Sequence, residues 1–367
     1  MPAPDSDQKA SRNDPWSASF WTGRRVLITG HTGFIGGWLS LALLELGADV
    51  HGIALPPPGT PSLFAASGLE SRLAHRIVDL RDLDPTRQAV REAMPEIVFH
   101  LAAQPIVRQA RQQPVESFAT NVMGTVHLLD ALRRHGGLRA ALVVTSDKVY
   151  ENDDTGRAHA EDDRLGGHDP YSASKAATEI VVASFRRSWF APAGVPLVTA
   201  RGGNVVGGGD FGADRLVPDI LRAAMAGRAP VLRNPEATRP WQHVLDCLSG
   251  YFTYLEAAAG RRDLPAALNF GPSAGMAPVP VAEVARRIQS ALGIALPWVP
   301  DAARGPHEMT RLAIDARRAT EVLGWRPRLG TEAAIAWTAE WYGAWLGGGD
   351  MAALCARQIA AYEEIPA

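Results

Sequence analysis

A short β-branched run, RVLIT at residues 25–29, leads directly into a glycine-rich turn, and a helical pattern of apolar residues begins at residue 34. The turn has the spacing G-x-x-G-x-x-G, formed by Gly30, Gly33 and Gly36. Glycines let such a turn tighten and let backbone N–H groups approach a pyrophosphate, which the N-terminus of the following helix also attracts. Strand, turn and helix in this order therefore predict a dinucleotide-binding unit rather than a turn that serves packing alone.

Strand-like and helical segments alternate along the rest of the first half of the chain. Apolar, β-branched runs predict strands at 49–55, 75–80, 96–102, 139–146 and 196–201. Amphipathic patterns predict helices at about 84–94, 115–134 and 170–190. This alternation indicates parallel βαβ units, and therefore an α/β fold with a doubly wound parallel Rossmann sheet.

The rhythm changes from about residue 204, where glycine and proline become frequent and the connections lengthen. The change predicts a smaller, interleaved C-terminal substrate-binding lobe. We expect a disordered tail over the polar residues 1–15. We expect the dinucleotide-binding Rossmann domain to cover 16–203 plus about 238–272. We expect the lobe to cover about 204–237 plus 273–367.

Composition argues against several classes of function. A formal net charge of -2 gives no sign of the basic footprint that binding to a nucleic-acid backbone would need, so no nucleic-acid partner is expected. No run of about 18 or more apolar residues occurs and residues 1–15 lack an apolar stretch, so neither a membrane span nor a signal peptide is expected. Cys247 and Cys355 have no C-x-x-C spacing, so neither a disulfide framework nor a metal site is expected. Together these features predict a cytoplasmic protein.

Tyr171 and Lys175 stand four residues apart in YSASK, within a segment expected to be helical, so both side chains fall on one helix face. The positive charge of Lys175 would favour the ionised phenolate form of Tyr171. We therefore expect the pKa of Tyr171 to fall from about 10 toward neutrality, and the phenol to act as a general base.

A polar stretch follows the strand expected at 139–146, and it consists of Thr145, Ser146, Asp147 and Lys148. Open α/β sheets bind ligands at the carboxyl ends of their strands. Adjacent opposite charges are usually only an exposed ion pair. Their expected position beside the tyrosine and lysine nevertheless favours a catalytic role for this stretch.

The end of the second expected strand does not choose between NAD and NADP. The acidic residue that would bind a ribose 2′-hydroxyl is missing, because Ala54 takes its place. No arginine stands beside Ala54 to bind a 2′-phosphate either.

Ten segments carry a resemblance when they are taken together, and the match runs from about residue 20 to 345: FWTGRRVLITGHTGF, PSLF, PEIVFHLAAQPIVR, TNVMGTVHLLDA, TSDKVY, DPYSASK, GGNVVGGGD, DRLVPDI, RPWQHV and LGWRP. In this order they resemble the CDP-glucose 4,6-dehydratases, within the extended short-chain dehydrogenase/reductase (NAD-dependent epimerase/dehydratase) family. The pair Asp147-Lys148 favours the CDP-glucose enzymes over other sugar dehydratases, since dTDP- and GDP-sugar dehydratases typically carry Asp-Glu at these two positions. Two positions depart from the pattern: Ile35 replaces a usual lysine, and Val149 replaces a frequent cysteine.

The resemblance implies NAD as cofactor, a nucleotide-sugar substrate with CDP-glucose favoured, and a homodimer or dimer of dimers formed through the helices near 115–134 and 170–190. It implies cofactor contacts from Gly30, Thr32, Gly33, Phe34, Ile35, Gly36, Asp79, Leu80, Leu101, Ala102, Ala103, Tyr171 and Lys175. It implies substrate contacts from Gln104, Asn121, Asn204, Arg215, Arg239 and His307, with Arg304 and Glu308 bordering the nucleotide.

The reaction implied is a dehydration, in which CDP-glucose becomes CDP-4-dehydro-6-deoxyglucose and water. A hydroxyl from Thr145 or Ser146 assists Tyr171, which takes the proton of the sugar 4-hydroxyl while the C4 hydride passes to NAD. Asp147 is the candidate acid for the leaving C6 hydroxyl. Lys148 either removes the C5 proton or stabilises the developing enolate. The hydride then returns to C6, so NAD is regenerated.

Two alternatives remain open from the sequence. The first is an NAD-dependent nucleotide-sugar epimerase or reductase, and the Asp147-Lys148 pair argues against it. The second is a non-catalytic NAD-sensing protein of the same fold, and the presence of both Tyr171 and Lys175 argues against it.

Overall fold

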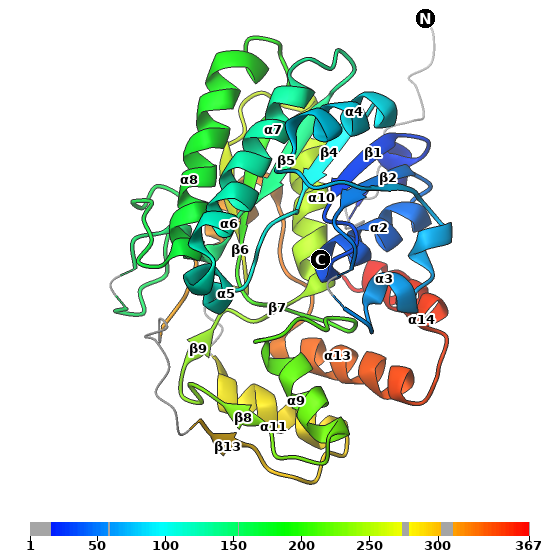
Figure 1. Cartoon of the computed structure of the whole chain (residues 1–367), viewed down its shortest axis with the longest axis vertical. Coiled ribbons are helices and arrows are strands. Elements are labelled where there is room, and N and C mark those ends of the chain that lie inside the picture. Colours follow the sequence, from blue (N-terminus) through cyan, green and yellow to red (C-terminus); the bar gives the residue numbers. More distant parts are fainter. Residues whose placement is uncertain (1–15, 58, 153, 274–278, 302–310, 367) are drawn as a thin grey trace, which may run out of the picture.

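The computed structural model describes residues 16–366 except 58, 153, 274–278 and 302–310, so the tail expected at 1–15 lies outside the described residues. Its centre is a seven-stranded sheet in the order β11-β6-β5-β4-β1-β2-β3, with all neighbouring strands parallel. The strands are β1 (Arg25–Thr29), β2 (Asp49–Ala54), β3 (Ala74–Ile77), β4 (Ile97–His100), β5 (Ala140–Val144), β6 (Leu197–Gly202) and β11 (Ala267–Phe270). The predicted doubly wound Rossmann sheet is confirmed (Figure 1).

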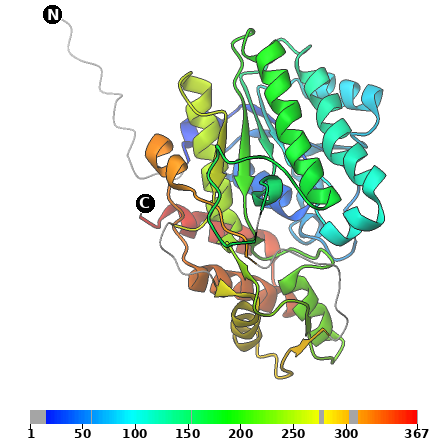
Figure 2. The ribbon, with the colours of Figure 1, turned by 90° about the vertical axis from the view of Figure 1, so that its left-hand side faces the viewer.

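Helices cover both faces of the sheet, as Figure 2 shows for α10 on one side and α8 on the other. Alternate strand residues supply the two cores: Val26 and Ile28 of β1 belong to one buried cluster and Leu27 to the other. The first cluster includes residues of α2 (Phe34–Glu45) and α10 (Val244–Gly260). The second includes residues of α4 (Leu83–Ala93), α7 (Gly124–Leu132) and α8 (Pro170–Phe185). Burial on both faces is what the apolar strand runs of a parallel sheet require.

The helix expected at 115–134 begins as α6 (Pro114–Phe118), passes through a π-helical turn, η2 (Ala119–Met123), and ends as α7. The segment expected at 170–190 likewise ends in a π-helical turn, η4 (Arg186–Phe190), after α8. Both helices were predicted as regular, because a single inserted residue hardly disturbs an apolar pattern. Such π turns are often found at functional sites.

The C-terminal part adds short elements that pair in twos: β7 (Val205–Val206) with β10 (Gln242–His243), β9 (Thr238–Arg239) with β12 (Val279–Pro280), and β8 (Val231–Leu232) with β13 (Val299–Pro300). Its helices are α9 (Leu216–Met225), α11 (Val281–Ala291), α12 (Arg317–Leu323), α13 (Thr331–Leu346) and α14 (Met351–Glu363). In Figure 1, α9, α11, β8 and β13 form a lobe below the sheet. The short elements elsewhere are α1 (Ala18–Trp21), α3 (Leu63–Ala66), η1 (Leu69–Ser71), α5 (Val107–Gln112) and η3 (Asp147–Val149).

The segment after β7 is fixed between α2 and α13. The indole of Trp38 on α2 donates a hydrogen bond of 2.8 Å to the Gly208 carbonyl. A Cβ on Gly208 would lie 1.9 Å from the Trp341 ring on α13, so only glycine fits there. Helix α14 contacts α2, which ties the end of the described chain to the Rossmann part. Among the helices described, none combines the length and the apolar character needed to span a bilayer.

Candidate active site

The glycine turn after β1 contains three glycines with different requirements. Gly30 has φ 82°, and a Cβ there would lie 2.9 Å from the Ala102 nitrogen. A Cβ on Gly36 would lie 2.2 Å from the Gly30 carbonyl oxygen, so this position is closed by packing. A Cβ on Gly33 would meet only that same oxygen, at 3.3 Å, and no side chain caps the helix that begins after it. The N-terminus of α2 is therefore open beside Gly33, which suits a pyrophosphate.

Three expected cofactor residues, Leu101, Ala102 and Ala103, follow β4 and are half-buried. The Ala102 amide donates to Thr29 Oγ1 at 3.2 Å, which fixes this loop to the end of β1. Because the strand order reverses between β1 and β4, the loop and the glycine turn lie together at the switch point where α/β sheets bind ligands.

The far side of the turn also follows the expected pattern. β2 ends at Ala54, and Thr32 donates its hydroxyl hydrogen to the Leu55 carbonyl at 2.9 Å. Asp79, expected at the adenine, accepts hydrogen bonds from the backbone and guanidinium of Arg81, and these hydrogen bonds lower its pKa. Its carboxylate is therefore partly engaged by Arg81, and an adenine contact stays a prediction. Leu80 is buried; Phe34 and Ile35, on the first turn of α2, are half-buried.

The two hydroxyls at the end of β5 have different partners. Thr145 Oγ1 donates to Glu179 Oε1 on α8 at 2.5 Å, so it points toward a buried carboxylate. Ser146 Oγ donates to Asp147 Oδ1 at 2.9 Å, and a hydrogen bond between Ser146 and Tyr171 lowers the phenol's pKa. Of the two candidates, Ser146 is the hydroxyl beside the tyrosine.

Asp147 is almost entirely buried, with 2% of its surface exposed. Its Oδ1 atom accepts from Ser146 and lies 3.8 Å from Lys148 Nζ, while its Oδ2 atom has no hydrogen-bond partner among the described residues. Leaving a buried carboxyl oxygen unpaired costs roughly 1–3 kcal/mol or more, so such an atom points to a missing partner. A substrate hydroxyl is a suitable partner.

Tyr171 and Lys175 lie on one face of α8, and both are buried. The expected lowering of the Tyr171 pKa is wrong for the unliganded protein: burial raises the pKa to about 12, although the Ser146 hydrogen bond and the charge of Arg215 act to lower it. Burial likewise lowers the pKa of Lys175 to about 8, opposed by Glu179. The ammonium donates to the Val144 carbonyl at 3.1 Å. Desolvation by burial is thus the largest effect on the pKa of both groups.

Gln104 and Asn121, both expected at the substrate, form hydrogen bonds with each other and with neighbouring segments. Asn121 is buried; its Oδ1 accepts from the Gln104 amide at 2.7 Å, and its Nδ2 donates to the Gln104 carbonyl and to Ser174 Oγ. The Gln104 side chain bonds to Ile106 and Ser117. These hydrogen bonds connect the loop after β4 to α6 and α8, and a substrate contact of either residue stays a prediction.

The remaining expected substrate residues come from the C-terminal part. Arg215 precedes α9, pairs with Asp210 at 2.9 Å and lies close enough to Tyr171 to influence its pKa. Asn204 lies between β6 and β7, and Arg239 lies in β9. His307 lies outside the described residues, as do Arg304 and Glu308.

Three buried residues beside the site were not expected from the sequence: His100, Glu179 and Arg201. His100 bonds to Thr29 and Thr125, and burial together with the charge of Lys175 lowers its pKa to about 3. Glu179 pairs with Arg201 of β6. The spacing of Glu179, four residues after Lys175, is the one signal that could have indicated it.

Comparison with known proteins identifies the family of the chain. The model of the GDP-mannose 4,6 dehydratase family matches residues 27–338. The chain belongs to this family. The expected resemblance is confirmed as well: a CDP-glucose 4,6-dehydratase of Salmonella typhimurium is 43% identical, over 94% of this chain and 97% of that protein.

Two further similar proteins share less sequence identity with the chain. A dTDP-glucose 4,6-dehydratase of Xanthomonas campestris is 30% identical, over 86% of this chain and 92% of that protein. The solved UDP-glucose 4-epimerase of Thermus thermophilus, a complex with NAD, is similar with a TM-score of 0.73 and 25% identity, over 86% of this chain and 98% of that one. The last likeness bears on the fold.

Proposed function

We propose that this protein is an NAD-dependent nucleotide-sugar 4,6-dehydratase, a lyase that converts CDP-glucose to CDP-4-dehydro-6-deoxyglucose and water. The observation that carries the proposal is the buried, unpartnered Asp147 Oδ2 beside Lys148 and Tyr171. Oxidation at C4 alone needs a base such as Tyr171, whereas loss of the C6 hydroxyl also needs an acid. The alternatives, an epimerase or reductase and an NAD-sensing protein, leave that oxygen without a use.

The residues of the turn fit NAD. Gly33 leaves space at the open N-terminus of α2, and the loop of Leu101 and Ala102 forms the facing wall. When bound, NAD accepts a hydride from the sugar and gives it back, so the overall reaction involves no net oxidation. Gly30, Thr32, Gly33 and the loop after β4 would hold it.

The protein's own groups would move the protons. Tyr171 takes the proton of the 4-hydroxyl, helped by Ser146 and by the positive charge of Arg215, both of which favour the phenolate. The ketone that forms at C4 acidifies the C5 proton. Asp147 then donates a proton from Oδ2 to the C6 hydroxyl as water leaves, and Lys148 acts at C5, as the base or as a cation beside the enolate.

The direct test is incubation of the protein with NAD and, separately, CDP-, dTDP-, GDP- and UDP-glucose, followed by mass spectrometry. We expect loss of one water from CDP-glucose. Loss of water from another nucleotide sugar would show that the substrate carries a different nucleotide base. A product of unchanged mass would indicate an epimerase.

Gly33→Val should weaken NAD binding by roughly tenfold or more, about 1.4 kcal/mol, because the branched side chain fills the space beside the α2 N-terminus. The protein should still fold, since a Cβ at this position meets only Gly30 O at 3.3 Å. Calorimetric titration with NAD measures the affinity. Gly136→Val is the matched control, because nothing lies within 4 Å of a Cβ there. Unchanged affinity in folded Gly33→Val protein would place the dinucleotide elsewhere.

We propose that two copies associate through α6, η2 and α8, as a homodimer or a dimer of dimers. Large apolar side chains are exposed on these elements, namely Val115, Phe118, Met123 and Ile180, and Trp189 of the adjoining η4 is exposed as well. The double substitution Met123→Glu and Ile180→Glu should therefore reduce the mass measured by light scattering to that of one chain. Met225→Glu is the control, because Met225 on α9 is 63% exposed and lies outside these elements. A wild-type protein with the mass of one chain would contradict the proposed association.

We also propose that the two-part division expected from the sequence corresponds to NAD binding and nucleotide-sugar binding, and that the protein acts in the cytoplasm. The second point is supported by Cys247 and Cys355, which are both buried and unpaired, as is usual in a reducing compartment.

A further inference from the structure

Glu179 of α8 is the centre of a buried polar network behind the catalytic residues. Its Oε1 atom accepts hydrogen bonds from Thr145 Oγ1 at 2.5 Å and Arg201 Nε at 3.0 Å. Its Oε2 atom accepts from Arg201 Nη2 at 2.8 Å and Thr199 Oγ1 at 2.9 Å. The side chains of Arg201 and Glu179 are only 6% and 5% exposed. Both charges are thus almost fully desolvated, and desolvation of a buried ion pair commonly cancels most of the attraction between its members.

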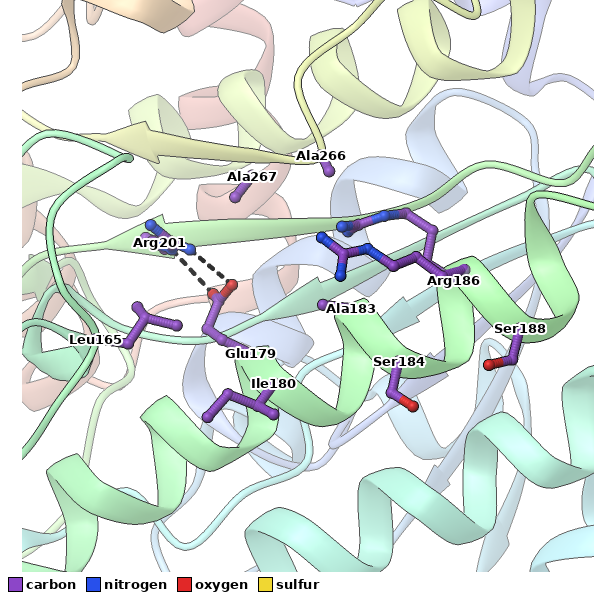
Figure 3. Close-up of a pocket in the computed structure, with 11 residues that line it drawn as sticks. Leu165, Glu179, Ile180, Ala183, Ser184, Arg186, Ser188, Arg201, Ala266 and Ala267 are labelled. Carbon is purple, nitrogen blue, oxygen red and sulfur yellow. Dashed lines mark hydrogen bonds and ion pairs between the residues drawn. The ribbon is translucent and has the colours of Figure 1, made fainter.

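Figure 3 shows Glu179 and Arg201 pointing toward one another from α8 and β6, at the wall of a pocket of about 540 Å³. Arg201 is fixed from its other side as well, because its Nη1 atom donates to the Tyr150 hydroxyl and to the Glu161 carbonyl, both at 2.9 Å. The carboxylate of Glu179 is therefore held in one place from three directions: β5, β6 and its own helix.

Two connections lead from Glu179 to Lys175. The first is through space, since the two residues are four apart on α8 and lie on one face. The second is through the end of β5. Glu179 accepts a hydrogen bond from the Thr145 side chain, and the carbonyl of the preceding residue, Val144, accepts a hydrogen bond from the Lys175 ammonium. Removing the carboxylate would disturb both the charge near Lys175 and the backbone that holds it.

The charged groups around this pair are few. Lys175 faces His100 on β4, which is neutral because burial and the charge of Lys175 lower its pKa to about 3. On α8 itself it shares a face with Tyr171. Glu179 faces Arg201 on β6, Tyr254 on α10 and Arg186 at the end of its own helix. Among these groups, Glu179 is the negative charge that acts on Lys175.

We infer that Glu179, held by Arg201, is a positioning residue that keeps Lys175 protonated and fixes the end of β5 for catalysis. The inference rests on the proposed function, in which Lys175 serves as a cation beside the tyrosine and the cofactor. Burial already lowers the pKa of Lys175 to about 8. Without the opposing charge of Glu179, the pKa of Lys175 would fall further.

The chain is suited to a direct measurement, because its only lysines are Lys9, Lys148 and Lys175. Protein labelled with ¹³C at lysine Cε gives three resonances, which Lys9→Arg and Lys148→Arg assign. In unliganded Glu179→Gln protein we expect the pKa of Lys175 to fall by roughly one unit or more. Glutamine keeps an oxygen that can accept from Thr145, so the change is chiefly one of charge. In the active enzyme, the alkaline limb of kcat/KM should move to lower pH by a similar amount.

Glu179→Gln leaves Arg201 buried without its partner and can therefore fail to fold. The double substitution Glu179→Gln and Arg201→Met removes both charges and is tolerated more often than the single loss; it should lower the pKa of Lys175 as well. Arg186→Gln is the matched control: it lies in the same pocket and makes no hydrogen bond to Glu179 among the described contacts, so Lys175 should titrate as in the wild type.

A folded variant that lacks Glu179 but shows unchanged titration of Lys175 and an unchanged pH profile would overturn the inference and leave the ion pair a purely structural one. The resonance measurement needs neither cofactor nor substrate. A shifted Lys175 in a protein that dehydrates no nucleotide sugar would therefore refute the proposed function while leaving the positioning role standing.

Discussion

Tyr171→Phe is expected to lower turnover by about a hundredfold or more, while leaving the affinity for NAD nearly unchanged. The substitution removes only the hydroxyl that accepts the 4-hydroxyl proton. The ring stays packed in its buried place on α8, so little stability should be lost. Steady-state rates with the nucleotide sugar found by the panel, together with calorimetric titration of NAD, measure the two effects separately.

Tyr254→Phe on α10 is the matched control, because it deletes another buried hydroxyl whose partner is the backbone carbonyl of Pro265. Activity should survive that change. Full activity of purified Tyr171→Phe would remove the tyrosine from the mechanism, and a parallel loss in both variants would point to a general effect of losing buried hydroxyls.

Features that depend on neighbours in the sequence could be predicted. The strand, glycine turn and helix from Arg25 to Glu45 follow from local pattern, and the structure has them at the expected places. The shared face of Tyr171 and Lys175 follows from helical spacing alone. Parallel order followed from the alternation of strands and helices, because a βαβ crossover leaves little choice of topology.

Features that depend on distant contacts could not be predicted. Which hydroxyl stands beside Tyr171 was left open, since nothing local shows that Thr145 is drawn to Glu179, a residue 34 positions away. In the same way, nothing local shows that the Asn121 side chain bonds to the backbone of Gln104, which lies 17 positions away. The raised pKa of Tyr171 could not be predicted either, because it results mainly from burial of the phenol by distant parts of the chain.

The second large effect is expected at Asp147, and it separates a dehydratase from an enzyme that stops at C4 oxidation. Asp147→Asn keeps the shape of the side chain and can still accept the hydrogen bond from Ser146, but it cannot donate a proton as an acid. The variant should oxidise C4 and stall before water leaves. Reduced nicotinamide should then accumulate on the enzyme, where its absorbance can be measured. Dehydration should be slower by about a hundredfold or more.

Lys148→Met, studied in parallel, shows which role the neighbouring ammonium has. If Lys148 is the base, the variant should also accumulate reduced nicotinamide, and in deuterated water it should take up no deuterium at C5. If Lys148 only stabilises the enolate, exchange should continue but slow by on the order of a hundredfold, the usual effect of one lost electrostatic contact. Asp147→Asn, in which the base is intact, is expected to keep exchanging C5.

Asp162→Asn and Lys9→Met are the matched controls for these two changes. Asp162 pairs with Arg318 and its side chain is 80% exposed, so the same loss of a carboxylate there should leave both readouts as in the wild type. Absorbance and deuterium incorporation must be recorded together, because accumulation alone does not distinguish a missing acid from a missing base. Dehydration at the wild-type rate in both Asp147→Asn and Lys148→Met would exclude the elimination roles. An epimerase or reductase would then explain the site better, since Tyr171 and the bound dinucleotide suffice for chemistry at C4.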